Sequence, residues 1–229
     1  MVLGIDVSTT ATKAILVDGS GGVRGIGVAE YPYETPRPQW SEQDPALWWD
    51  GTQAAIRAAL AAAGVDGGDV ATVGLTGQMH GSVLLDADDQ PVRPAILWND
   101  QRTAAECDAI REAVGPERLI QITGNDALTG FTAPKLLWVR SHEPEAWARV
   151  TGVMLPKDYV RLRLTGERAV DKADGAGTLL FDLAARDWSE EMLAALDLDP
   201  TLFPRTFEGP AVTGTVTAGA AAATGLAAG

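Results

Sequence analysis

The sequence has 229 residues, of which 46% are hydrophobic, and it carries a formal net charge of −13 at pH 7. This composition is sufficient for the core of one large domain or two small ones and excludes a disordered chain, while the acidic balance argues against a nucleic-acid groove lined by Lys and Arg. A single cysteine, no apolar run of membrane-spanning length and no signal peptide predict a cytoplasmic protein without disulfides or a membrane partner.

The first thirty residues predict three strands, Val2–Val7, Thr12–Asp18 and Val23–Glu30, connected by short polar turns. Because short turns join antiparallel neighbours, these strands should form a meander. The segment 31–38 holds three prolines, so it should be extended rather than helical.

The rest of the chain alternates between helical and extended patterns. A helix should begin at Asp44-Pro45, with Asp44 as its N-cap, and should end near Gly64. Further elements are expected at 70–76, 82–86, 103–113, 134–142, 145–149, 153–155, 159–164 and 187–196. Three hairpin-linked strands before such an alternation favour a mixed α/β sheet, antiparallel on one side and parallel on the other, with helices on both faces.

The turn after the first strand has the residue types of a phosphate site. Asp6 lies near the strand end and is followed by Ser8, Thr9 and Thr10. A carboxylate at a strand end can hold a hydrated divalent cation, and hydroxyl groups with the N–H groups of a turn can hold phosphate oxygens. The same residue types also satisfy the backbone of an ordinary turn, so the pattern alone leaves both interpretations open.

Two polar clusters follow apolar runs further along the chain. The first is Gln78-Met79-His80, and the second is Trp98-Asn99-Asp100. Together they offer hydrogen-bond donors and acceptors and an apolar wall, which a polyhydroxylated ligand requires. Both should emerge at strand ends beside the phosphate turn. Alternatively, His80 caps a carbonyl in a loop, and Asn99-Asp100 is a turn-and-cap pair before a helix.

Other chemically conspicuous residues have simpler interpretations. Lys13 could reach a phosphate, or it could be a solvated lysine on an alternating strand. Cys107 lies in a predicted helix without a base or metal partner, which favours a structural thiol. The remaining tryptophans are assigned to packing, namely Trp40, Trp48, Trp49, Trp138, Trp147 and Trp188.

Several stretches, taken in order, resemble the FGGY family of carbohydrate kinases over essentially the whole chain. They are Gly4–Thr10, Gln39–Pro45 with Trp48-Trp49, Gly77–Gly81, Ala95–Asp100, Gly130–Trp138 and Leu155–Tyr159. Within the family, Gln78-Met79-His80 and Trp98-Asn99-Asp100 are similar to the members that act on xylulose rather than on glycerol. The resemblance implies an actin-like ATPase or ribonuclease H-like fold with a mixed five-stranded sheet whose first three strands are antiparallel.

The resemblance also implies transfer of the γ-phosphate of ATP, with magnesium, to D-xylulose. By position, Asp6 would hold the metal, and Ser8, Thr9, Thr10 and Lys13 would contact the nucleotide phosphates. The sugar would be bound by the two polar clusters, Gln78, Met79, His80, Trp98, Asn99 and Asp100. Ser8 stands where the family often has glycine, which implies either an ordinary backbone conformation at this position or some strain.

The family's general-base aspartate lies in a Gly-Gly-Asp segment that has no counterpart among residues 1–229, and it is expected after Gly229. Residues 1–229 should therefore be the amino-terminal, sugar-binding domain without the carboxy-terminal ATP-binding domain. We expect such a chain to be catalytically incomplete. The face that would normally meet the second domain would be exposed, and such apolar surface favours a homodimer through that face. The alternatives are an FGGY kinase for another ketose or polyol, a stand-alone sugar-binding module, and an actin- or Hsp70-like ATPase.

Overall fold

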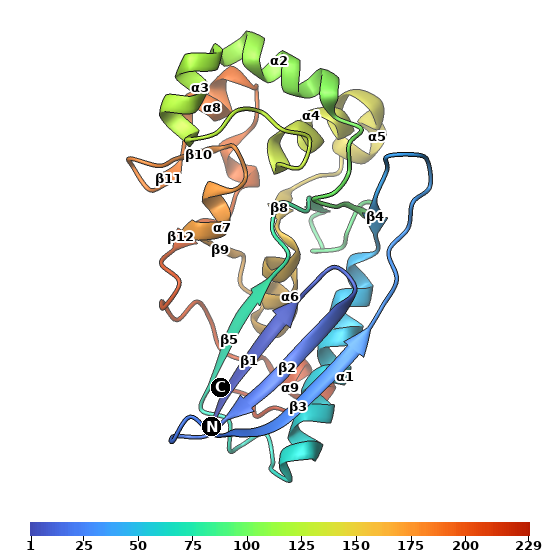
Figure 1. The fold of residues 1–229 in the computed structure, drawn as a ribbon, viewed down its shortest axis with the longest axis vertical. Helices are drawn as coiled ribbons and strands as arrows, with labels where there is room; N and C mark the ends of the chain where they lie inside the picture. The colour runs from blue at the N-terminus through green and yellow to red at the C-terminus, as the bar shows by residue number, and fades with distance from the viewer.

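The computed structural model describes all residues from 1 to 229. A four-stranded sheet with the order β3-β2-β1-β5 forms the end of the molecule that holds both termini (Figure 1). Strands β1 (Val2–Val7), β2 (Ala11–Val17) and β3 (Val23–Glu30) form the predicted antiparallel meander. Strand β5 (Thr72–Gly77) pairs with β1 in parallel, so the sheet is mixed as expected.

The sheet has four strands and not the five that were predicted. The remaining short strands pair with one another in two-stranded ladders and do not join this sheet. These are β4 (Glu42–Gln43) with β7 (Ala95–Ile96), β6 (Val83–Leu85) with β8 (Gly152–Met154), β9 (Ala169–Asp171) with β12 (Arg205–Phe207), and β10 (Phe181–Asp182) with β11 (Asp187–Trp188).

Helix α1 (Pro45–Ala63) packs against one face of the sheet at very short range. An added Cβ at Gly25 of β3 would lie 2.3 Å from the carbonyl oxygen of Ala59, and one at Gly27 would lie 2.0 Å from that of Ala55. Only glycine therefore allows this approach. As predicted, the Asp44 side chain caps the helix by accepting a hydrogen bond from Ala46 N, and Gly64 ends it in the left-handed conformation.

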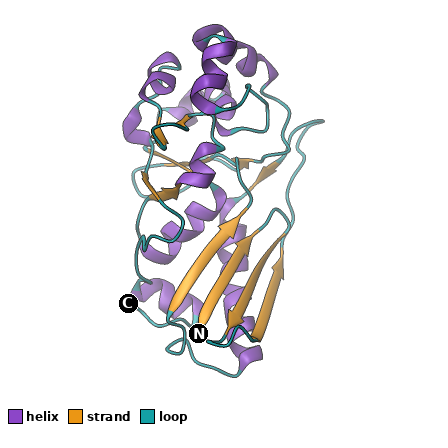
Figure 2. Cartoon of the chain, turned by 60° about the vertical axis from the view of Figure 1, so that its left-hand side comes forward, coloured by secondary structure: helices purple, strands orange, loops and turns teal.

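Helices cover only one face of the sheet, which corrects the prediction of helices on both faces. Helices α6 (Pro156–Thr165) and α9 (Ala218–Thr224) pack beside α1 on that face, as Figures 1 and 2 show. The opposite face, called here the uncovered face, exposes five apolar side chains: Val2, Ile15, Val23, Ile26 and Val28.

A second hydrophobic core lies in the helical half of the molecule. It is built from α2 (Ala104–Val114), α3 (Pro116–Thr123), α4 (Thr132–His142) and α8 (Glu190–Ala195). Cys107 is buried there, and burial raises the pKa of its thiol to about 11, which agrees with a structural role. The remaining helical elements are α5 (Pro144–Trp147), α7 (Lys172–Ala176) and the 3₁₀ turn η1 (Pro200–Leu202).

The helix predicted over 187–196 begins later than expected. Asp187 and Trp188 form strand β11, and Ser189 then caps α8 by accepting a hydrogen bond from Met192 N at 3.2 Å. The predicted N-cap is therefore correct, but the two residues before it are extended. None of the helices combines the length and the apolar character that crossing a membrane requires.

Candidate active site

The phosphate turn connects β1 to β2 and contains Ser8, Thr9 and Thr10. It closes through a hydrogen bond of 2.9 Å from Ser8 N to Ala11 O. The Ser8 hydroxyl donates to Asp6 Oδ2 at 2.7 Å and so orients the carboxylate. Ser8 has no positive φ, and the turn therefore needs no glycine here.

Asp6 lies on the uncovered face beside Lys13, its neighbour across the β1–β2 ladder. Lys13 is exposed and forms no ion pair, so its ammonium group is available to an anion. No group of three or more His, Cys, Asp or Glu side chains is arranged to hold a metal ion. A single carboxylate nevertheless suits Mg²⁺, which proteins commonly bind through one or two carboxylates together with substrate phosphates.

The carboxyl ends of β1 and β5 point together toward the helical half (Figure 1). Gln78 follows β5 directly, and its N–H donates to Val7 O at 2.8 Å. The Thr9 hydroxyl donates to Gln78 Oε1 at 3.1 Å and accepts from Trp98 Nε1 at 3.1 Å. One hydroxyl group of the phosphate turn thus joins the two polar clusters predicted to bind the sugar.

Both clusters present groups that the chain itself leaves free. Met79 and Trp98 are about half exposed, at 51% and 48%, which is unusual for large apolar side chains. Gln78 Nε2 and Asn99 Oδ1 are buried without any hydrogen-bond partner. Because buried polar groups are nearly always paired, an unpaired donor and an unpaired acceptor on these clusters fit a polar ligand.

His80 has an unusual backbone and one firm contact. Its φ is +66°, in the left-handed region, and its Nδ1 lies 2.6 Å from Gly177 O. Burial is the main cause that lowers the pKa of the imidazole. The predicted alternative of a carbonyl-capping histidine is therefore present, yet it occupies only Nδ1 and leaves Nε2 without a partner in the chain.

Asp100 is placed differently from its predicted role at the sugar. The side chain is completely buried, and Oδ2 accepts hydrogen bonds of 2.7 Å from both Ser41 N and the Arg102 guanidinium. Arg102 is buried too, pairs with Glu42 at 2.7 Å and stacks over the Trp40 ring at 3.6 Å. The carboxylate therefore holds the loop together and has no free oxygen to offer a sugar.

A buried charge cluster beside the site was not predicted. Lys157 Nζ lies 2.9 Å from Asp158 Oδ1, 2.6 Å from Asp171 Oδ2 and 2.7 Å from Asp174 Oδ2. Burial alone would lower the pKa of Lys157, but the three carboxylates outweigh it and raise that pKa. The sequence signal that could have indicated this cluster is the pair Asp171 and Asp174, three residues apart, of which Asp171 caps α7.

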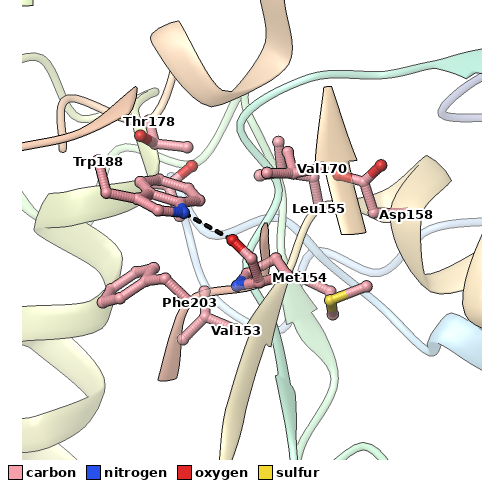
Figure 3. A pocket seen from close by; sticks show the side chains of 10 residues that line it. Val153, Met154, Leu155, Asp158, Val170, Thr178, Trp188 and Phe203 are labelled. Atoms are coloured by element: carbon pink, nitrogen blue, oxygen red, sulfur yellow. Dashed lines mark hydrogen bonds between the residues drawn. The ribbon is translucent and has the colours of Figure 1, made fainter. Parts of the chain in front are cut away.

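A small cavity of about 10 Å³ next to this cluster is not a sugar site (Figure 3). It has room for about one water molecule. Its lining is mostly apolar, with the Asp158 carboxylate at one side, and Asp158 Oδ2 has no hydrogen-bond partner. The Trp188 ring closes the other side and donates from Nε1 to Pro204 O at 2.7 Å.

Comparisons with known proteins agree on one family. The model of the FGGY family of carbohydrate kinases, N-terminal domain, matches residues 1–229. The xylulose kinase of Klebsiella pneumoniae is 50% identical over 214 residues, which are 93% of this chain and 44% of that protein. The xylulose kinase of Escherichia coli K12 is 46% identical over 99% of this chain and 46% of its own length. The chain thus spans about half the length of the curated relatives it matches.

A solved structure gives the same result in three dimensions. The crystal structure of xylulose kinase from Rhodospirillum rubrum superposes with a TM-score of 0.92 at 33% sequence identity. The match covers 98% of this chain and 46% of that one. Both the sheet and the helical half therefore have counterparts in that enzyme.

Proposed function

The chain belongs to the FGGY family of carbohydrate kinases and has their actin-like fold, and from this premise we propose that it is the sugar-binding, amino-terminal half of a D-xylulose kinase. The complete enzyme would transfer the γ-phosphate of ATP to a hydroxyl group of D-xylulose and form D-xylulose 5-phosphate. The names of the relatives that match at 46–50% identity support this choice of sugar.

The observation that carries the proposal is the junction at Thr9. Its hydroxyl group contacts Gln78 and Trp98 at once, so the turn suited to phosphate and both clusters suited to sugar lie within hydrogen-bonding distance of one residue. Phosphoryl transfer is largely a matter of positioning the acceptor hydroxyl against the phosphate. A shared contact residue between the two subsites provides such positioning.

Each side of the proposed sugar subsite has a distinct task. Gln78 Nε2 would donate to a sugar oxygen, and Asn99 Oδ1 and His80 Nε2 would each accept from a sugar hydroxyl. Met79 and Trp98 would cover the carbon chain of the sugar. Asp100 would act indirectly, because its buried pair with Arg102 fixes the loop that carries Trp98 and Asn99.

On the phosphate side, Asp6 would hold Mg²⁺, which, when bound with ATP, neutralises phosphate charge. The N–H group and hydroxyl of Thr10, with the ammonium of Lys13, would contact phosphate oxygens. Ser8 already donates its N–H to Ala11 O and its hydroxyl to Asp6, so it would act by shaping the turn and orienting that carboxylate. Thr9 already donates its hydroxyl hydrogen to Gln78 and would have to release it before donating to a phosphate. Without a positioned general base, we expect residues 1–229 to bind sugar but to phosphorylate it slowly or not at all.

Calorimetric titration of this chain tests the proposal. D-xylulose should bind, while D-ribulose and glycerol should bind more weakly. His80→Ala should abolish binding, whereas the matched His142→Ala variant should bind like the wild type, because His142 lies on the surface at the end of α4. If a folded chain bound none of these sugars, or bound glycerol as well as D-xylulose, the proposed substrate would be wrong.

A further inference from the structure

Lys135 on α4 is an unusual buried lysine. It has no exposed surface and forms no ion pair; instead its Nζ donates to His80 O at 2.9 Å and to Gly130 O at 2.7 Å. Lysines are almost never fully buried unless they are paired with an acid. Because Lys135 donates to two backbone carbonyls instead of pairing with an acid, the role of its side chain lies with these two carbonyls.

The two carbonyls belong to the segments that carry the proposed sugar contacts. His80 is itself in the first cluster. Gly130 abuts the second, because an added Cβ at this glycine would lie 2.9 Å from Trp98 O. The carbonyl of His80 also accepts from the Thr132 hydroxyl at 3.2 Å, so two donors from α4 hold the left-handed peptide at residue 80. Such a conformation persists only where its surroundings fix it.

The side chain of His80 is held from the other direction. A carbonyl oxygen can only accept, so the contact of 2.6 Å between Nδ1 and Gly177 O requires the hydrogen on Nδ1. An added Cβ at Gly177 would lie 2.7 Å from His80 Cε1, and Phe131 packs against the ring edge-to-face at 5.0 Å. Gly177 follows α7, and Asp174 of that helix is bound to the buried Lys157.

We propose that Lys135 is a positioning residue for His80: it fixes the backbone so that the ring stays against Gly177 and presents an unprotonated Nε2 to a hydroxyl group of the substrate. The ligand class follows from the tautomer. Nε2 accepts a hydrogen bond and does not donate one, so it selects a hydroxyl donor over a carboxylate or phosphate oxygen. This deepens the proposed function and rests on it only in naming the sugar as the ligand of His80.

The protonation of both residues agrees with this role. Burial is the main cause that lowers the pKa of Lys135 to about 7 and that lowers the pKa of His80. A neutral amine keeps two N–H donors, which is the number of carbonyls that Lys135 contacts. The bracing therefore does not depend on the charge of this lysine.

The test uses the ¹⁵N-labelled chain and records long-range ¹H–¹⁵N correlations of the imidazole rings at pH 7. The chain has only two histidines, so His142 serves as an internal reference. Wild-type His80 should show a protonated Nδ1 and an unprotonated Nε2. Lys135→Met replaces the lysine by an unbranched apolar side chain that is one atom shorter and has no donor. In this variant the ¹⁵N shifts of His80 should move toward tautomer averaging, and D-xylulose affinity should fall at least tenfold.

A second variant changes the other side of the His80 ring, so the test does not depend on Lys135→Met folding normally. Gly177 has a φ of −78°, which alanine adopts freely, so Gly177→Ala should displace only the His80 ring and give the same two changes. Lys172→Met, at an exposed contact to Arg186 O, should leave both readouts unchanged.

The proposal is overturned if wild-type His80 carries its proton on Nε2, or if folded Lys135→Met keeps both the ¹⁵N signature and the affinity of the wild type. The NMR readout needs no sugar. If the wild type bound no sugar while the variant still altered the His80 tautomer, the proposed function would fail and the positioning role would stand.

Discussion

Replacing Asp100 by asparagine should lower the free energy of unfolding far more than replacing a residue that only contacts the sugar. The carboxylate is completely buried and forms four of its five hydrogen bonds with Arg102, whose side chain is 1% exposed. Asparagine has nearly the same shape as aspartate but no charge, so Asp100→Asn leaves the buried Arg102 guanidinium without the negative charge of its partner. Breaking a buried ion pair from one side costs about 3–5 kcal/mol.

For a chain of this length each kcal/mol corresponds to about 2–4 °C, so the melting temperature should fall by about 6–20 °C. Urea unfolding followed by circular dichroism measures the loss. Asp108→Asn is the matched control, because Asp108 pairs with Arg111 at 2.8 Å on the surface, and removing such a pair should change the unfolding free energy by about 0.5 kcal/mol or less.

A double-mutant cycle with Arg102→Met separates the pair from its surroundings, and the double variant should recover part of the loss. The reasoning is refuted if Asp100→Asn unfolds within about 1 kcal/mol of the wild type and yet no longer binds D-xylulose. That result would return Asp100 to the direct sugar contact predicted from the sequence.

Three further predictions follow from the site and the sheet. Thr9→Val removes the hydrogen bonds to Gln78 and Trp98, and since each is worth about 1 kcal/mol, D-xylulose affinity should fall by up to about thirtyfold by calorimetry; Thr10→Val, which disturbs neither bond, is the control. The folded pKa of His80 is depressed, so the unfolded chain binds more protons below pH 6.5 and stability is lost as the pH falls through that value. Urea unfolding between pH 7 and pH 5 should therefore show a smaller loss in His80→Gln than in the wild type, and equal losses would contradict this. Finally, the uncovered face should drive self-association in analytical ultracentrifugation: Ile26→Lys on that face should yield monomers, while Ile120→Lys on the surface of α3 should not. If the wild-type chain sedimented as a monomer at high concentration, self-association through the uncovered face would be wrong.

The sequence predicted the elements that depend on local patterns. Strands β1 and β3 have the predicted bounds, and α1 has its predicted caps, because apolar runs and capping residues act within a few positions. The uncovered face could not be predicted, since it depends on which helices return to the sheet. Strand β11 was missed because its pairing with β10 overrides the helical pattern that follows it.

The same distinction applies to the site. Strand ends place residues 6–10 and 78–80 together, and this was predictable from β1 and β5 alone. The role of Asp100 could not be predicted from the sequence, because its partner Arg102 is also held by Glu42 and Trp40 from a distant segment. Lys135 and Lys157 lie in stretches that resemble the family, but their burial could not be predicted, since burial of a charged residue has no signature in the sequence.

The glycines of β3 have a mechanical consequence. Where Gly25 and Gly27 meet α1, backbone touches backbone and no layer of side chains remains that could change rotamers, so the strand and the helix cannot slide past each other. Gln43 extends this block to the phosphate turn, because its Nε2 donates to Thr9 O at 2.9 Å while its Oε1 accepts from Trp48 Nε1 of α1. Amide hydrogens of 23–30 and 45–63 should therefore exchange with deuterium as one cooperative unit, and the helical half, with its own core, should open separately.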